Sequence, residues 1–418
     1  MSSFEDLIET AVRDGILPGV VLYAKDKSGQ LDYAKVISPE NTPHIPTLTS
    51  SSTLWLASAT KLITTIAVLQ LVERGKVTLD EDVAPHIPAL ASQQVLTGFT
   101  STSDDDARPV PILEPRGNPL TLRHLLTHSA GTTYDFLSPD VIQRWQALND
   151  ITPISGANVE ERFAHPLVYQ PGREWSYSNS IDWAGCVVES VTGVDLETYL
   201  RTNIFEPLGL ESFTFSRARV AGEEEAGEKK KGGEKGNNTL WPLSEREAST
   251  GRVIPHTTGV GIDLQRGVEA PLGGQGLYGR MDEYLVILHS LLLDDGRLLR
   301  PQTAAGMFRP QLGEASKKSL LEKMEDSSWT VGDLPPTREY DWAFGGLLVD
   351  GEAHPRRRPG TLIWGGAANI FWWIDRETGL AGVFGTQIMP AGEAVTRGYI
   401  KAFEDEMYSR VQSLKRGY

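Results

Sequence analysis

The sequence predicts an α/β protein of the α+β type, in which both chain ends build one antiparallel sheet and a mainly helical region is inserted between them. Two observations predict this class. Short β-rich runs gather near the two ends of the 418-residue chain, and helical periodicity dominates its middle. Because a strand must bury its apolar face against other elements, one sheet shared by both ends is the simplest arrangement.

The N-terminal part is expected to hold a helix followed by a hairpin. An amphipathic helical pattern is followed by "GVVLYAKDKSGQLDYAKVIS", in which Lys-Ser-Gly separates two β-rich runs. Near the other end, "FGGLLVD", "GTLIWGG", "NIFWWID" and "LAGVFGTQ" are short runs punctuated by Gly, Pro and Asp, which predicts four further strands. A last helix is expected from Ala394 to about Val411.

The middle of the chain reads as helices that end in Gly-containing stops, among them "TLRHLLTHSAG" and "SIDWAGCVVESVTGVDLETYLRTNIFEPLG". We therefore expect a discontinuous sheet domain from residues 1–75 and 255–418, a helical domain from 76–254, and an active site in the cleft between them. Two low-complexity segments, 100–109 and 222–239, are expected to be mobile surface loops.

Composition excludes several function classes. The net charge of −15 and the lack of a sustained basic stripe argue against nucleic acid and anionic membranes as partners. Three arginines at 356–358 fit a solvated loop before a strand. The N-terminus lacks the pattern of a secretory signal, no run of eighteen apolar residues occurs, and the single cysteine suits a reducing compartment, so we expect a cytoplasmic protein.

The stretch "LWLASATKLITTIAVLQLVERG" places Lys61 where an almost wholly apolar helix begins, three residues after Ser58. Positions i and i+3 lie on one helix face, so the serine Oγ and the lysine Nζ can meet. Burial favours the neutral amine, which can take the serine proton, and free N–H groups at a helix start favour negative charge on the serine. The pair thus predicts a nucleophile and its base, although a chain of this length also allows S-x-x-K by chance.

Two distant motifs supply partners for this pair. Tyr177-Ser178-Asn179 precedes a helix, where a phenol can relay a proton and an amide can hold a lysine or a carbonyl. The second motif is "WGGA" at residues 364–367, where glycines at a strand end allow a backbone N–H to approach a substrate oxygen.

In this order the three motifs resemble those of the serine β-lactamase and penicillin-binding-protein superfamily. Antibiotic-handling members normally carry Lys-Thr-Gly as the third motif, whereas Trp364 stands at that place here. This departure argues against a β-lactam or peptidoglycan substrate and towards carboxylesterases of the family VIII type, which resemble class C β-lactamases. The stretches "LTLRHLLTHSAG", "DWAG", "FEPLGL" and "GGQG" further resemble the fungal lovastatin acyltransferase group and its statin-ester hydrolase relatives, almost end to end.

The resemblance implies a β-lactamase-like fold, a polyketide or statin side-chain ester as substrate, and an acyl-serine intermediate. Carried over by position, Ser58 is the nucleophile, Lys61 the general base and Tyr177 the second proton-transfer residue, while Ala367 shares the oxyanion hole with the backbone of Ser58. The residues expected to contact the substrate are Tyr134, Asn179, Trp364, Gly365 and Gly366. Core packing explains Tyr134 and Trp364 equally well.

Hydrolysis by water is favoured over acyl transfer, because a transferase needs an acyl carrier or other thioester donor that nothing in the sequence indicates. Neither a cofactor nor a metal is expected. His124 and His128 have the spacing of a zinc pair, but the glutamate of H-E-x-x-H and a third ligand are missing. "GQGLYG" at 274–279 fits G-x-G-x-x-G, yet no strand precedes it, so it is interpreted as a glycine-rich wall of the active site.

Overall fold

The computed structural model describes residues 3–39, 46–100, 108–221, 240–256 and 264–417. Its centre is a seven-stranded sheet in the order β2-β1-β13-β12-β11-β10-β9. The strands are β1 (Val20–Asp26), β2 (Asp32–Ile37), β9 (Tyr340–Ala343), β10 (Gly346–Val349), β11 (Leu362–Gly366), β12 (Ile370–Asp375) and β13 (Leu380–Gly385).

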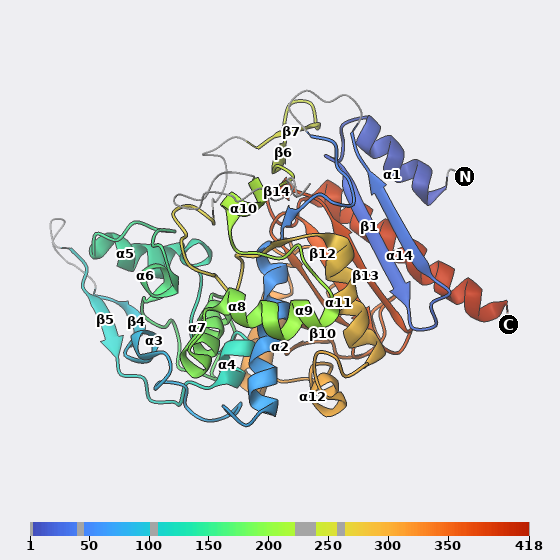
Figure 1. Ribbon diagram of the computed structural model, residues 1–418. Helices are drawn as coiled ribbons and strands as arrows, with labels where there is room; N and C mark the ends of the chain where they lie inside the picture. The colour runs from blue at the N-terminus through green and yellow to red at the C-terminus, as the bar shows by residue number, and fades with distance from the viewer. Residues whose placement is uncertain (1–2, 40–45, 101–107, 222–239, 257–263, 418) are drawn as a thin grey trace, which may run out of the picture.

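Both chain ends meet within this sheet, as predicted. Strand β1 pairs antiparallel with its hairpin partner β2 on one side and with β13 on the other, where Val21 lies opposite Gly385. In Figure 1 the blue N-terminal strands and the red C-terminal strands lie side by side at the right of the molecule. The predicted antiparallel sheet is thus confirmed, and the strand missing from the sequence analysis is β9 at one edge.

Helices cover the two faces of the sheet. On one face lie α1 (Phe4–Arg13) and the long C-terminal helix α14 (Ala394–Arg416), whose Phe403 ring packs on Phe384 of β13. On the other face lies α11 (Met281–Leu293), whose Met281 fills the space beside Gly385. Because adjacent residues of a strand point to opposite faces, these two contacts place the helices on opposite sides. Helix α1 starts with a reciprocal capping box between Ser3 and Asp6.

The middle of the chain is mainly helical, and Figure 1 shows its helices to the left of the sheet. Helix α2 (Thr60–Glu73) runs between the two parts, and its residues from Thr60 to Leu71 are buried, which explains its lack of a polar face. The other helices here are α3 (Pro88–Ala91), α4 (Leu122–Leu126), α5 (Arg144–Leu148), α6 (Val159–Phe163), α7 (Ser180–Thr192), α8 (Leu196–Leu200), α9 (Glu206–Leu208) and α10 (Arg217–Ala221).

Short strand pairs and two later helices complete the fold. Strand β3 (Leu54–Trp55) pairs with β8 (Tyr278–Gly279), and β6 (Ser244–Arg246) lies between β7 (Val253–Pro255) and β14 (Ile388–Met389). The remaining α-helices and β-strands are β4 (Val95–Phe99), β5 (Pro111–Glu114), α12 (Pro301–Gly306) and α13 (Glu314–Lys323). Short 3-10 or π segments lie at Asp135–Leu137, Pro139–Gln143 and Arg201–Phe205. The proposed domain boundaries stay a prediction. Residues 222–239 and most of 100–109, predicted to be mobile loops, lie outside the described residues.

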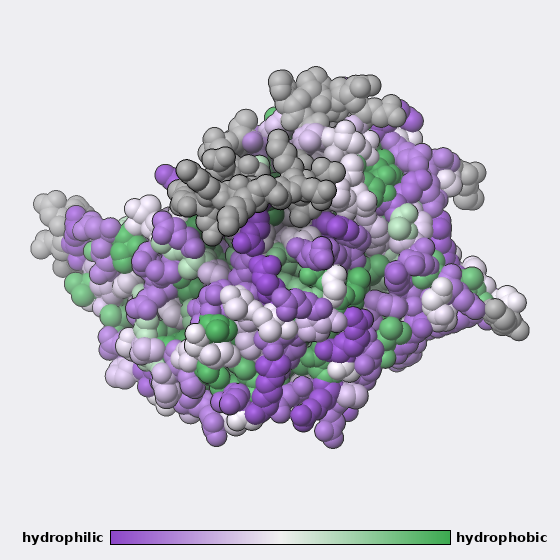
Figure 2. Space-filling model, viewed as in Figure 1, coloured by the Kyte–Doolittle hydropathy of each residue, from purple (hydrophilic) through white to green (hydrophobic). Residues whose placement is uncertain are grey.

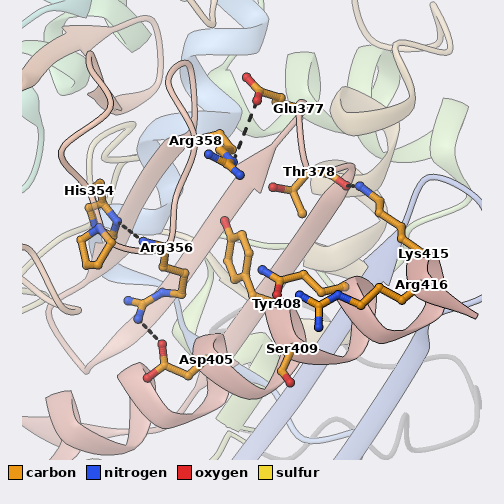
Figure 3. Close-up of a pocket in the computed structure, with 12 residues that line it drawn as sticks. His354, Arg356, Arg358, Glu377, Thr378, Asp405, Tyr408, Ser409, Lys415 and Arg416 are labelled. Atoms are coloured by element: carbon orange, nitrogen blue, oxygen red, sulfur yellow. Dashed lines mark hydrogen bonds and ion pairs between the residues drawn. The ribbon is translucent and has the colours of Figure 1, made fainter.

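The three-arginine segment is the clearest correction. Arg356 and Arg357 are not solvated, because their side chains are 6% and 0% exposed and both contact Glu404 of α14. Only Arg358 extends towards solvent, beside Glu377. Figure 3 shows this region, where Arg356, Arg358 and Asp405 line a cavity of about 620 Å³ along α14.

Hydrophilic residues cover most of the face seen in Figure 2, and hydrophobic residues occur there in small scattered groups. Within the residues that the structure describes, no helix combines the length and the apolar character needed to cross a membrane.

Candidate active site

Ser58 lies in a tight turn rather than in the helix that the sequence predicted for it. The turn is a single 3-10 segment, Ala57–Ala59, and α2 follows at Thr60. Ala57 has a φ of 46°, a left-handed conformation that a non-glycine residue seldom adopts. Such a residue costs about 1–3 kcal/mol and persists only where its surroundings enforce it. The turn holds Ser58 partly exposed at the start of an otherwise buried helix.

Lys61 is buried, with 1% of its surface exposed, and its ammonium position has three neighbours. Nζ lies 3.3 Å from Ser58 Oγ, 3.0 Å from the Tyr134 hydroxyl and 2.8 Å from the carbonyl oxygen of Gly274. The predicted contact between serine and lysine is therefore present. The other two contacts offset the cost of burying the amino group.

Tyr177 stands beside the same amino group, since Lys61 Nζ lies 4.8 Å from the centre of its ring. The phenol oxygen accepts a hydrogen bond from Trp364 Nε1 at 3.0 Å. The Trp364 and His128 rings pack on the Tyr177 ring with centroid distances of 5.0 and 4.8 Å. The phenol therefore lies between the amino group of Lys61 and an N–H donor.

The glycines of β11 allow this strand to approach the serine turn. A Cβ on Gly366 would lie 2.1 Å from the carbonyl oxygen of Leu56, two residues before Ser58. Only glycine fits this spacing, which brings the following residue, Ala367, to the cavity that Ser58 lines. From the sequence we expected glycines here because the backbone must approach another group closely. The contact between Gly366 and Leu56 is such an approach.

Ser58 opens onto a cavity of about 780 Å³. Of the predicted residues, Tyr134, Tyr177, Trp364, Gly365, Gly366 and Ala367 line it together with Ser58. Most of the remaining wall is apolar, and a polar edge is formed by residues of β6 and its surroundings. The apolar residues, which the sequence analysis did not single out, are Phe136, Leu137, Ala248, Ile254, Leu264, Trp329, Val331, Met389, Pro390 and Ala391.

The structure does not bring Asn179 to the cavity. Its side chain is fully buried, and its amide donates a hydrogen bond to the carbonyl oxygen of Thr133 at 2.9 Å. Asn179 also precedes α7 as its N-cap residue, so its geometry is that of a residue that ties this helix to the segment before Tyr134. A direct contact with substrate, which the sequence analysis expected of Asn179, has no support in this arrangement.

Burial and charge set the protonation of three groups near Lys61. Burial, with the carboxylate of Asp182 next, raises the pKa of Tyr134 well above its ordinary value, so its hydroxyl keeps its proton. Burial and the positive charge of Lys61 lower the pKa of His128 well below its ordinary value, so its imidazole is neutral. Burial also raises the pKa of Asp182, while Lys61 acts in the opposite direction.

Comparison with known proteins identifies the family of this chain. The sequence model of the family described as "Beta-lactamase" matches residues 4–404. The chain belongs to the β-lactamase family. The predicted β-lactamase-like fold is thereby confirmed, and so is the resemblance to the lovastatin acyltransferase and esterase group.

Three members of this family are similar to the chain over nearly their full length. A monacolin J acid methylbutanoyltransferase of Aspergillus terreus is 35% identical, with 97% of this chain and 96% of the relative covered. A lovastatin esterase of Penicillium rubens is 34% identical, with 97% and 98% covered. A solved structure of a simvastatin synthase mutant from Aspergillus terreus superposes with a TM-score of 0.84 at 34% identity, with 98% and 95% covered. These similarities are consistent with either of two activities for this chain, ester hydrolysis or acyl transfer.

Proposed function

We propose that this protein is a serine carboxylic ester hydrolase that forms an acyl-serine intermediate on the side-chain ester of a polyketide or statin-like molecule. The observation that carries the proposal is the placement of Lys61 Nζ 3.3 Å from Ser58 Oγ beneath an apolar cavity. A buried amine next to a hydroxyl is the arrangement of a Ser-Lys nucleophile.

Acylation starts when Ser58 Oγ attacks the ester carbonyl carbon and its proton passes to the neutral amine of Lys61. The N–H groups of Ser58 and Ala367 stabilise the oxyanion. The C–O bond to the alcohol then breaks, and Tyr177 gives its phenol proton to the departing oxygen. The acyl-serine is left beside a lysine ammonium and a phenolate, and the Trp364 N–H supports the phenolate.

Deacylation follows the same route in reverse. Water attacks the acyl carbonyl and gives one proton to the Tyr177 phenolate. When the C–O bond to Ser58 breaks, the serine oxygen takes the proton back from Lys61. The products are the free acid and the enzyme in its starting protonation state, so protons balance over the two steps.

The cavity supports a bulky, weakly polar substrate. The cavity volume of about 780 Å³ lies within the range of pockets that bind drug-sized ligands. Its wall carries the indole of Trp329 and the side chains of Leu264 and Val331, which bind hydrocarbon better than charge. A bulky apolar acyl or polyketide group fits this lining.

Acyl transfer is the second candidate function. It is favoured by the 35% identity to a monacolin J acid methylbutanoyltransferase, an enzyme named for the transfer of a methylbutanoyl group. The chemistry differs only in the second nucleophile, because an alcohol that fills the cavity excludes water from the acyl-serine. This route requires a thioester donor such as an acyl carrier.

The test supplies a statin ester with and without a competing polyketide alcohol and follows free acid against transferred ester by mass spectrometry. Hydrolysis predicts that free acid dominates in both reactions, and transfer predicts that the new ester dominates when alcohol is present. Ser58→Ala should abolish both products and the covalent acyl adduct. Full activity of Ser58→Ala on a short p-nitrophenyl ester would overturn the catalytic assignment.

A β-lactamase activity is the rival that this test must separate. The indole of Trp364 occupies the wall where a lysine ammonium would bind the carboxylate of a β-lactam. We expect no turnover of a chromogenic cephalosporin under conditions in which p-nitrophenyl butyrate is hydrolysed. Faster cleavage of the cephalosporin than of the ester would contradict the proposed substrate class.

A further inference from the structure

Asp182 is a buried carboxylate for which the proposed mechanism has no role. It lies in the first turn of α7, none of its surface is exposed, and it is absent from the cavity wall. A buried carboxylate is costly unless hydrogen bonds or opposite charge offset the loss of solvent. Its neighbours therefore indicate what it does.

Both oxygens of Asp182 bind groups that contact Lys61. Oδ1 accepts a hydrogen bond from the backbone N–H of Gly274 at 2.9 Å, and Oδ2 accepts one from the Tyr134 hydroxyl at 3.4 Å. The carbonyl oxygen of Gly274 and the hydroxyl oxygen of Tyr134 are the two neighbours of Lys61 Nζ other than Ser58. Asp182 thus holds both of these neighbours, and in the part of the chain that the structure describes no hydrogen bond or ion pair joins it directly to Lys61.

Glycine at 274 is required for this arrangement. A Cβ on Gly274 would lie 2.3 Å from Asp182 Oδ2. The residues on both sides of Gly274 are also fixed by hydrogen bonds. Thr64 Oγ1 donates to the Gly273 carbonyl at 2.6 Å, and Trp55 Nε1 donates to the Gln275 carbonyl at 2.8 Å. The carboxylate and the Gly274 backbone therefore form one rigid unit with α2.

This unit determines which hydrogen atoms point at Lys61. The Gly274 carbonyl can only accept, so it uses one N–H of the lysine. The Tyr134 hydroxyl gives its hydrogen to Asp182, so its oxygen must also accept from Lys61. A neutral amine has two N–H groups and one lone pair, and both N–H groups are then engaged. The lone pair is left for the hydroxyl of Ser58.

We propose that Asp182 is a positioning residue that, through Tyr134 and Gly274, keeps the Lys61 lone pair directed at Ser58. Without the carboxylate, the Tyr134 hydroxyl is free to donate its own hydrogen to Lys61 and to compete with Ser58 for the lone pair. The inference rests on the proposed acyl-serine function and adds a residue that touches neither substrate nor the reacting atoms.

The first test replaces Asp182 by Asn, which keeps the size of the side chain and an oxygen that can accept from Gly274. The amide NH₂ then faces the Tyr134 oxygen, so the phenol hydrogen turns towards Lys61. We expect kcat for p-nitrophenyl butyrate to fall about 10- to 100-fold, the effect of losing one hydrogen bond to a charged group. The KM should change by less than about twofold, because Asp182 does not line the cavity.

A second variant separates positioning from a loss of structure. Adding Tyr134→Phe to Asp182→Asn removes the competing hydroxyl, so the double variant should be at least as active as Asp182→Asn alone. If Asp182 serves only the packing of α7, the two losses should instead multiply. That multiplication would overturn the proposal.

Glu189→Gln is the matched control. Glu189 lies on the same helix, and its carboxylate likewise accepts a backbone N–H, that of Leu196 at 2.9 Å, outside the Lys61 network. This variant should keep the wild-type kcat. The rate of Ser58 labelling by a fluorophosphonate should fall in Asp182→Asn but not in Glu189→Gln, and thermal unfolding should show both variants folded.

Two failures can be told apart by including Ser58→Ala. If Ser58→Ala keeps its activity, the proposed function fails. If Ser58→Ala is inactive while Asp182→Asn has the kcat and labelling rate of the wild type, only the role of Asp182 is overturned.

Discussion

The indole N–H of Trp364 points at the phenol oxygen of Tyr177, and 3.0 Å separates the two atoms. Trp364 stands where the resemblance to β-lactam-handling enzymes places a lysine, and its N–H is bonded to the residue for which we propose the second proton transfer. An indole at this place brings an N–H donor to the Tyr177 oxygen and carries no positive charge of its own. This arrangement suits an enzyme that handles neutral esters.

Trp364→Phe should lower kcat more than it changes KM. The variant keeps an aromatic ring in the cavity wall but removes the hydrogen bond to Tyr177. A hydrogen bond to a charged group is worth about 1.5–3 kcal/mol, so kcat should fall about 10- to 150-fold. Steady-state kinetics on p-nitrophenyl butyrate measures this. Trp342→Phe is the control, because Trp342 packs on Trp364 at a centroid distance of 4.7 Å and should cause a smaller loss.

Gly366→Ala should reduce activity severely while the protein stays folded. The new methyl group would lie 2.1 Å from the Leu56 carbonyl, so β11 or the Ser58 turn must shift. A displacement of about 1 Å at the reacting atoms can cost about 100-fold in rate. Gly398→Ala on α14, where a Cβ meets nothing within 4 Å, should leave kcat unchanged. Wild-type rates for Gly366→Ala would show that the close approach is not needed.

The sequence was sufficient for features that depend on local pattern. Alternation and turn residues located β1, β2 and the strands from β10 to β13, and the apolar surroundings of Lys61 singled out the Ser58 pair. It did not reveal the strand β9 or the partners of Lys61, because Tyr134, Asp182 and Gly274 are far apart in the chain. Only the packing of α7 and the 272–277 loop against α2 brings them together.

The segment at 356–358 shows the same limit for charged residues. Three consecutive arginines indicate solvent exposure when only composition is considered. Arg356 and Arg357 share Glu404 of α14 as a partner, 48 and 47 positions later in the chain, and no local sequence pattern indicates such a pairing. Burial of charge is a property of the tertiary arrangement, and the sequence-based expectation of a solvated loop was wrong for this reason.

Acid should destabilise the fold through His354. Burial, with the charges of Arg357 and Arg356 next, lowers the pKa of this imidazole to about 3, against an ordinary value of about 6.5. Its Nδ1 accepts backbone N–H groups from Arg357 at 2.9 Å and Arg356 at 3.2 Å, which leaves no room for a proton. The unfolded chain binds this proton and the folded chain does not. Stability is therefore complete above pH 6.5 and falls as the pH decreases towards 3.

Urea unfolding at pH 7 and pH 5 checks this sign. Each pH unit within that window changes the free energy of unfolding by up to about 1.4 kcal/mol for one such group. His354→Gln should reduce the difference between the two pH values, whereas His86→Gln should leave it as in the wild type. An equal difference in all three proteins would contradict the assignment to His354.

Arg357 and Glu404 form an ion pair in which both side chains are 0% exposed. Arg357 Nε donates to Oε1 at 2.9 Å and the guanidinium NH2 group donates to Oε2 at 2.6 Å. Removing Arg357 leaves the buried Glu404 carboxylate with only the longer contact to Arg356 at 3.3 Å, so Arg357→Met should lower the free energy of unfolding by about 3 kcal/mol. The double variant Arg357→Met with Glu404→Leu replaces both charges by apolar groups of similar length. It should recover part of this loss, because the desolvation cost of this pair is gone and Arg356 keeps Asp333 and Asp405 as partners. Urea unfolding at pH 7 compares the three proteins. A double variant as unstable as Arg357→Met alone would mean that the pair is held for packing rather than for charge compensation.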